Sequence, residues 1–321
     1  LSSSHSKTGK SIAVLPLENM SPDSENAFFA DGVHEDILTN LSKIKELFVI
    51  GRTSALQYRD SIKTLPQIGE ELNVNYLVEG SVRRAGDQVM VTIQLIDAQT
   101  GGHLWAENYN RKLDDIFAIQ AEIAKNVAKK LHATISSKES TSIERVPTKN
   151  LEAYDHYVRG RELVQSIEGV ERSREFYERA LELDPKFAAA HLGMGWHYFW
   201  MVIHNYIPPR EGFSKVIEWL GSAKALKSND LGEWKSLSGI TNLWYNWDWE
   251  VAREELEQAT ALDPNAITGL GYYFLVTGDF DNALKCAEKA VELDPLHLKL
   301  RLDLGNFYRL AGNYDESVNT L

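Results

Sequence analysis

The stretch Ala180-Leu181-Glu182-Leu183-Asp184-Pro185 decides how the C-terminal half of the chain folds. It returns as Ala259-Thr260-Ala261-Leu262-Asp263-Pro264, as Ala290-Val291-Glu292-Leu293-Asp294-Pro295 and, in worn form, as Ala223-Lys224-Ala225-Leu226-Lys227-Ser228. Alanine lies five positions before the last residue of each copy, and the residues eight positions before it are Tyr177, Leu256, Leu220 and, as a small exception, Ala287. This pattern predicts the second helix of a helix-turn-helix unit that a proline closes.

A helix-turn-helix unit that recurs about every 34 residues is the pattern of the tetratricopeptide (TPR) class, which the chain resembles. We expect about four and a half irregular TPR repeats over residues 150–321, truncated at Leu321. Residues 203–209 form an insertion between two helices, so the spacing of the repeats is uneven. Members of the class stack helix pairs into a curved solenoid whose concave face binds other proteins.

Composition excludes several classes of function. The 321 residues allow two domains, and the formal net charge of −12 makes nucleic acid a poor partner, because an acidic surface repels phosphates. We find no run of about 20 apolar residues, so no membrane span is predicted in this segment. The single cysteine, Cys286, cannot form an internal disulfide.

The first half alternates between helix and strand patterns. Apolar positions repeat every three to four residues over 29–44, 65–72 and 116–131, which predicts helices. Short apolar runs at 11–17 and 47–50, and alternating runs at 76–82, 89–95 and 103–109, predict strands. We therefore predict an α+β N-terminal domain of order β-α-β-α-β-β-β-α, followed by an all-α TPR superhelical solenoid.

Residues 10–135 closely resemble the TolB amino-terminal-like domain. The resemblance is carried by the segments Ser11–Pro16, Phe29–Gly32, Arg52–Ser54, Leu77–Arg83 and Gly102–Glu107. It implies that the TolB-like domain and the repeats follow a class III adenylate cyclase, a winged-helix DNA-binding or a serine/threonine kinase domain, often with a membrane helix between them. The implied role is sensing or scaffolding, and the ligand is left open.

The ends and the join between the two parts are polar. We interpret residues 1–9 as a linker or a cloning remnant and residues 136–149 as a linker. Since the chain starts at Leu1 rather than Met and stops halfway through a predicted helix, we expect a fragment of a longer protein. A membrane helix before Leu1 would place this part in the periplasm, and otherwise it is cytoplasmic.

Motifs of catalysis are missing from the sequence. We find no Gly-x-Ser-x-Gly elbow, no phosphate-binding loop, no His-Glu-x-x-His and no paired cysteines, so we predict no enzyme activity, no cofactor and no metal for this fragment. The pairs Gly193/Gly195 and Gly269/Gly271 lack a third glycine and a preceding strand, and we interpret them as close helix packing rather than nucleotide binding. The histidines at 156, 191, 197 and 204 lack metal-site spacing.

Aromatic residues give the sharpest indication of a site. Seven of the eight tryptophans lie between residues 196 and 249. The TPR register places the following on first helices facing the groove: Trp196, Trp200, Trp234, Trp244 and Tyr272. The same register places Trp219 and Trp249 on or beside packing positions. The alternative is that all of these side chains fill the core, although rigid aromatics are favoured anchors at interfaces.

Our principal hypothesis is a non-catalytic protein-interaction and signal-input segment of a larger bacterial protein. It would bind a protein or peptide with apolar side chains in the concave groove. The charged clamp by which some TPR domains hold a terminal carboxylate is absent.

The first alternative is a small-ligand or anion sensor in the TolB-like domain that uses Arg52, Arg83 and Arg84, although surface ion pairs are the commoner role of such arginines. The second alternative is a homodimer.

Overall fold

The computed structural model describes residues 9–23, 26–164, 166–226 and 231–321. It forms two compact units, one of Leu1–Val146 with Ala290–Leu302 and the other of Pro147–Lys289 with Asp303–Leu321. Of the predicted N-terminal linker, 1–9, all but Gly9 lies outside the described residues. The predicted linker 136–149 contains helix α5 (Ser137–Ile143), which begins with a capping box of Ser136 and Glu139.

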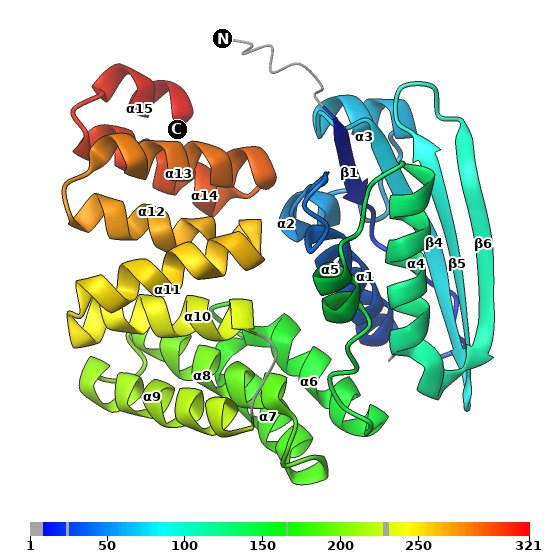
Figure 1. Cartoon of the computed structure of the whole chain (residues 1–321), viewed down its shortest axis with the longest axis horizontal. Helices are drawn as coiled ribbons and strands as arrows, with labels where there is room; N and C mark the ends of the chain where they lie inside the picture. The colour runs from blue at the N-terminus through cyan, green and yellow to red at the C-terminus, as the bar shows by residue number, and fades with distance from the viewer. Residues whose placement is uncertain (1–8, 24–25, 165, 227–230) are drawn as a thin grey trace. The chain divides into compact units, whose positions relative to one another are not determined.

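The first unit contains a mixed sheet with the strand order β3-β1-β4-β5-β6. Figure 1 labels the strands β1, β4, β5 and β6 of this sheet. Strand β1 (Lys10–Val14) pairs in parallel with β3 (Leu47–Val49) and β4 (Tyr76–Ala85). Strands β5 (Gln88–Asp97) and β6 (His103–Lys112) continue the sheet in antiparallel fashion, and the two-residue β2 (Glu18–Asn19) pairs with β4. The parallel part needs the helical crossovers that the sequence predicted.

Helices complete the core of the sheet. The domain contains α1 (Ala27–Ser42), α2 (Arg52–Leu56), α3 (Leu65–Glu71), a 3₁₀ turn (Leu113–Asp115) and α4 (Ile116–Lys130), of which α4 contacts α1, β5 and β6. Alternate residues Val89, Val91, Ile93 and Leu95 of β5 are fully buried, as the predicted period of two requires. The α+β prediction is confirmed, with β2, α2 and α5 as short elements that lacked a periodic pattern.

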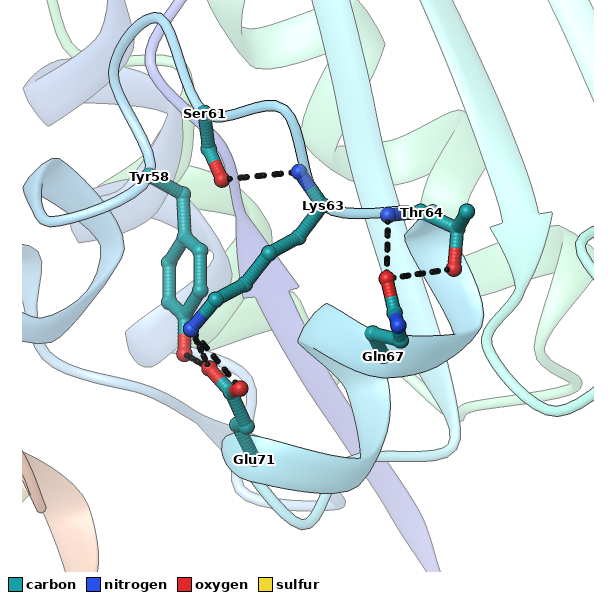
Figure 2. A network of polar contacts seen from close by, with 6 residues as sticks. All are labelled: Tyr58, Ser61, Lys63, Thr64, Gln67 and Glu71. Atoms are coloured by element: carbon teal, nitrogen blue, oxygen red, sulfur yellow. Dashed lines mark hydrogen bonds and ion pairs between the residues drawn. The ribbon is translucent and has the colours of Figure 1, made fainter.

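A polar network fixes the loop between α2 and α3 (Figure 2). The Tyr58 hydroxyl donates to Glu71 Oε2 at 2.8 Å, and Lys63 Nζ donates to both oxygens of the same carboxylate at 2.7 Å. Thr64 and Gln67 form a capping box, in which the Thr64 backbone N–H donates to Gln67 Oε1 at 2.9 Å. The capping box fixes where α3 begins, and the contacts to Glu71 join the end of α3 to the preceding loop.

The second unit is built of the antiparallel helix pairs that the repeated phrase predicts. The helices of the repeats are α6 (Leu151–Val164), α7 (Val170–Leu183), α8 (Ala188–Ile203), α9 (Pro209–Ala225), α10 (Leu231–Thr241), α11 (Trp249–Leu262), α12 (Ile267–Val276), α13 (Phe280–Leu293), α14 (Leu298–Leu310) and α15 (Tyr314–Thr320). Residues 290–302, which end α13 and begin α14, are grouped with the first unit. The three copies that end in proline lie at the ends of the second helices α7, α11 and α13, and α9 ends within the worn copy, whose residues 227 and 228 lie outside the described residues. The large residues that lie eight positions before the end of three copies, Tyr177, Leu220 and Leu256, are buried.

Glycines let the helices approach closely. A Cβ added at Gly160 would lie 2.8 Å from the Tyr177 ring, and one at Gly193 would lie 2.4 Å from it. Tyr177, 1% exposed, therefore fills a space that two glycines leave open. An added Cβ would lie 2.6 Å from Leu237 at Gly195, 2.8 Å from Leu256 at Gly269 and 3.2 Å from Cys286 at Gly271, so the paired glycines allow close packing as predicted.

Candidate protein-binding surface of the repeats

The predicted groove residues lie on successive first helices of the repeats. Trp196 and Trp200 belong to α8, Trp234 to α10, and Tyr272 to α12. Trp244 lies in a π-helical turn, Asn242–Asn246, that extends α10. Helix α10 contacts both α8 and α12, so the five side chains come from neighbouring helices. Whether they bind a partner stays a prediction.

Trp196 and Trp200 flank a buried aromatic residue. Their rings stand edge-on to Phe199 with centroids 5.4 and 5.3 Å away, and Phe199 itself is 4% exposed. Trp200 also stacks on His204, with centroids 5.5 Å apart and planes at 18°. Both indoles are half-buried, so each has one part in the core and another at the surface.

Trp234 has a hydrogen bond and two cationic neighbours within the repeats. Its indole N–H donates to the Leu220 carbonyl oxygen at 3.0 Å. Lys224 Nζ lies 5.1 Å from the ring centroid and Lys235 Nζ lies 6.0 Å from it. The indole N–H and the ring thus already have partners within the unit, which gives Trp234 a packing role in addition to any role in binding.

An aromatic row is formed by Trp244, Tyr272 and Phe307. The sequence analysis did not predict Phe307 as a member of this site. The rings of Trp244 and Tyr272 have centroids 5.9 Å apart, and those of Tyr272 and Phe307 are 5.3 Å apart. Burial, followed by the Asp303 charge and a hydrogen bond to Asp303, raises the pKa of Tyr272 well above its usual range, so its ring carries no charge at neutral pH. Phe307 lies one repeat length after Tyr272, which is the sequence signal that would have found it.

The remaining tryptophans differ in exposure. Trp219 is half-buried beside His191, with ring centroids 5.4 Å apart, as expected for a side chain at a packing position. The sequence places Trp249 on or beside a packing position, yet this first residue of α11 is 42% exposed. Trp247, to which the sequence assigned no role, is 72% exposed.

The three arginines of the predicted anion site have separate partners. Arg52 Nε lies 3.4 Å from Glu35 Oε2 on α1, and Arg83 Nε donates to the Met20 carbonyl oxygen at 3.3 Å. The Arg84 guanidinium lies over the Phe29 ring at 5.0 Å. Anion binding by this set stays a prediction, and it would require an anion to compete with these contacts.

Two buried histidines have structural partners. Nδ1 of His197 lies 2.9 Å from the Val170 carbonyl oxygen and 3.1 Å from Ser173 Oγ. Nε2 of His34 lies 2.9 Å from the Val14 carbonyl oxygen. Burial lowers the pKa of both imidazoles, so both are neutral at pH 7.

Over the described ranges, His, Cys, Asp and Glu side chains form no cluster of three suited to a metal ion. No helix among them is long and apolar enough to cross a bilayer.

Comparison with protein families supports this description of both units. Residues 8–126 match the family described as the HilA/YgeH-like transcriptional regulator, second domain, and residues 268–321 match a tetratricopeptide repeat family. The chain joins a HilA/YgeH-like second domain to TPR repeats. These matches confirm the resemblance to a TolB-like domain followed by TPR repeats. The matched TPR segment includes Tyr272 and Phe307 of the aromatic row.

A curated relative and several solved structures are similar to this TPR chain. "Putative adenylate cyclase 3" of Rhizobium meliloti (strain 1021) is 43% identical over 186 residues, which cover 57% of this chain and 32% of that protein. This chain thus spans about a third of the length of that relative. TolB from Acinetobacter baumannii is 19% identical (TM-score 0.31; 38% of this chain, 28% of that one). YrrB, described as a TPR protein with an unusual peptide-binding site, is 23% identical (TM-score 0.33; 56% and 87%).

Proposed function

We propose that the TPR unit binds an extended segment of a protein partner through aromatic side chains of its first helices. The observation that carries this proposal is the row Trp244–Tyr272–Phe307, which is buried at Phe307 (3% exposed) and open at Trp244 (43% exposed). A ring that is fixed on one side and exposed on the other loses little entropy on binding. Such side chains are favoured anchors of interfaces.

Partner side chains that would contact this row are apolar. The Trp244 and Tyr272 rings offer a large area for burial, at about 25 cal/mol for each Å² removed from water. Trp196 and Trp200 lie on α8, the first helix that contacts α10, and would extend the contact along the solenoid. An extended segment suits this arrangement because its alternate side chains can meet successive repeats.

The wider role that we propose is that of a regulatory, non-catalytic segment in an adenylate cyclase-like signalling protein. It is supported by the 43% identity to the Rhizobium meliloti relative and by the match of residues 8–126 to a domain of transcriptional regulators. Binding of a partner to the repeats would then supply the signal, and an output domain of the longer protein would carry out the response.

Capture from bacterial lysate with residues 10–321 as bait tests the binding surface. Trp244→Ala removes the open end of the row, and Ile217→Ala is the matched control, since Ile217 is 42% exposed on the second helix α9. We expect a protein that the parent and Ile217→Ala retain and that Trp244→Ala loses. Retention by all three would show that the aromatic row is not the binding surface.

The alternative proposal is an anion sensor that uses Arg52, Arg83 and Arg84. A thermal-shift screen with nucleotides and inorganic anions tests it, because an anion present at 100 times its dissociation constant stabilises the fold by about 2.7 kcal/mol. A shift that Arg83→Gln abolishes would support this alternative. Unchanged melting temperatures across the screen would reject it.

A further inference from the structure

The turn between α10 and α11 has an unusual backbone. The π-helical segment Asn242–Asn246 ends at Trp247, which adopts the left-handed conformation with φ 59° and ψ 26°. The backbone N–H of Trp247 and that of Asp248 both donate to the Asn242 carbonyl oxygen, so Trp247 occupies the position that closes a helix. Glycine or asparagine usually stands there, because a side chain crowds the left-handed backbone.

Trp247 differs from the other residues of this conformation. Within the described ranges, the non-glycine residues with positive φ are Asp60, Asn73, His132, Asn205 and Trp247. Asp, Asn and His are the types enriched there, whereas a bulky residue is an outlier. Local strain of this kind, like single π-helical turns, concentrates at functional sites.

The Trp247 side chain does little for the core. It is 72% exposed, and Trp249, two residues later, is 42% exposed. A strained backbone that presents an indole to water is not explained by packing. An exposed indole is instead a good surface for a planar or charged group of a partner.

The charge around the turn indicates the sign of that partner. Residues 242–258 carry five carboxylates and one guanidinium, and that guanidinium, of Arg253, already pairs with Glu257 at 2.8 Å. The exposed residues Asp248 and Glu250 immediately flank Trp249. Elsewhere in the same unit Lys224 lies over the Trp234 ring at 5.1 Å, an internal example of a cation on an indole.

We propose that the turn Trp247–Glu250 is a docking site for a basic, arginine-containing segment of a partner protein. A guanidinium can stack on an indole face and donate two parallel hydrogen bonds to a neighbouring carboxylate, which an ammonium group cannot do. This surface goes beyond the proposed groove, because it lies in the turn that joins two helices of one repeat and uses different residues.

Fluorescence anisotropy with a labelled hexa-arginine peptide tests the proposal on the full chain. We expect saturable binding below about 1 mM, weaker binding of hexa-lysine, and at least a tenfold loss in Trp247→Gly. Glycine adopts the left-handed conformation without strain, so this variant should melt at the same temperature as the parent or higher. Asn205→Gly makes the matched change at another positive-φ position, φ 61°, and should bind like the parent.

Further variants keep the outcome decisive. If Trp247→Gly loosens the turn and lowers the melting temperature, Trp247→Asn replaces it, since asparagine also tolerates this backbone. Trp196→Ala/Trp200→Ala should keep hexa-arginine binding, so loss of the groove and loss of this site are told apart. Equal binding by the parent and the stable Trp247 variant would overturn the proposal, as would equal affinity for hexa-arginine and hexa-lysine.

Discussion

The indole of Trp244 stands edge-on to the phenol ring of Tyr272, with centroids 5.9 Å apart and planes at 75°. Tyr272 meets Phe307 in the same manner, at 5.3 Å and 76°. Three successive first-helix regions are thereby joined by one row of rings. The row runs from an exposed ring to a buried one, so its two ends should respond differently to truncation.

Phe307→Ala should lower the free energy of unfolding by about 3–5 kcal/mol, because it empties a buried ring position. Trp244→Ala should lower it by only about 0.5–1.5 kcal/mol, which is the worth of one aromatic pair. Urea unfolding of both variants measures the difference. Losses of similar size would show that Trp244 is as much a core residue as Phe307 and would weaken the proposed binding role.

Gly193→Ala should destabilise the repeats by about 1–3 kcal/mol, since the new Cβ would lie 2.4 Å from the Tyr177 ring. Gly221, inside helix α9, has no neighbouring atom within 4 Å of an added Cβ. Gly221→Ala should therefore stabilise the protein by about 0.5–1 kcal/mol through helix propensity alone. Chemical denaturation of the two variants compares them, and a stabilising Gly193→Ala would contradict the close packing.

Stability should fall as the pH drops below about 6.5, the pKa of histidine in an unfolded chain. Burial lowers the pKa of His197 in the folded state, so the unfolded state binds the proton first and acid favours unfolding. The slope is at most about 1.4 kcal/mol per pH unit for one such group. His34 contributes in the same direction.

The variant His197→Gln should flatten this dependence between pH 5 and 6.5, and His34→Gln should remove a separate share of it. Urea unfolding at several pH values gives the slopes. A profile of His197→Gln that is parallel to that of the parent would mean that the imidazole protonates equally well in the folded state.

Arg52→Gln should lower the free energy of unfolding by about 1–3 kcal/mol, because it leaves a largely buried Glu35 without the guanidinium 3.4 Å away. Adding Glu35→Gln should recover part of the loss, as expected for coupled neighbours. The melting temperatures of the parent and of Arg52→Gln, measured with and without sulfate, test whether Arg52 binds an anion. Sulfate that stabilises the parent but not Arg52→Gln would favour the anion site over the internal ion pair.

The sequence determined the repeat architecture, because the helix-closing phrase acts locally. The place where a second helix packs and stops is specified by an alanine, a large residue one turn before it and a proline after it. Helices α7 and α11 follow this pattern as predicted. The strands of the first unit were predicted from local patterns too, β1 and β3 from short apolar runs and β4, β5 and β6 from a period of two. The short elements β2, α2 and α5 span too few residues to show a period.

Only the tertiary structure decided what each tryptophan contacts. A repeat register assigns Trp234 and Trp244 to first-helix positions, but their environment depends on side chains from other helices. The Leu220 carbonyl holds the Trp234 indole, whereas Trp244 leaves its helix in a π turn and stays exposed. The left-handed backbone of Trp247 is likewise fixed by hydrogen bonds to Asn242, which residue preference alone would assign to a glycine. Periodicity specifies the face of a helix, while packing between helices determines how much of that face water reaches.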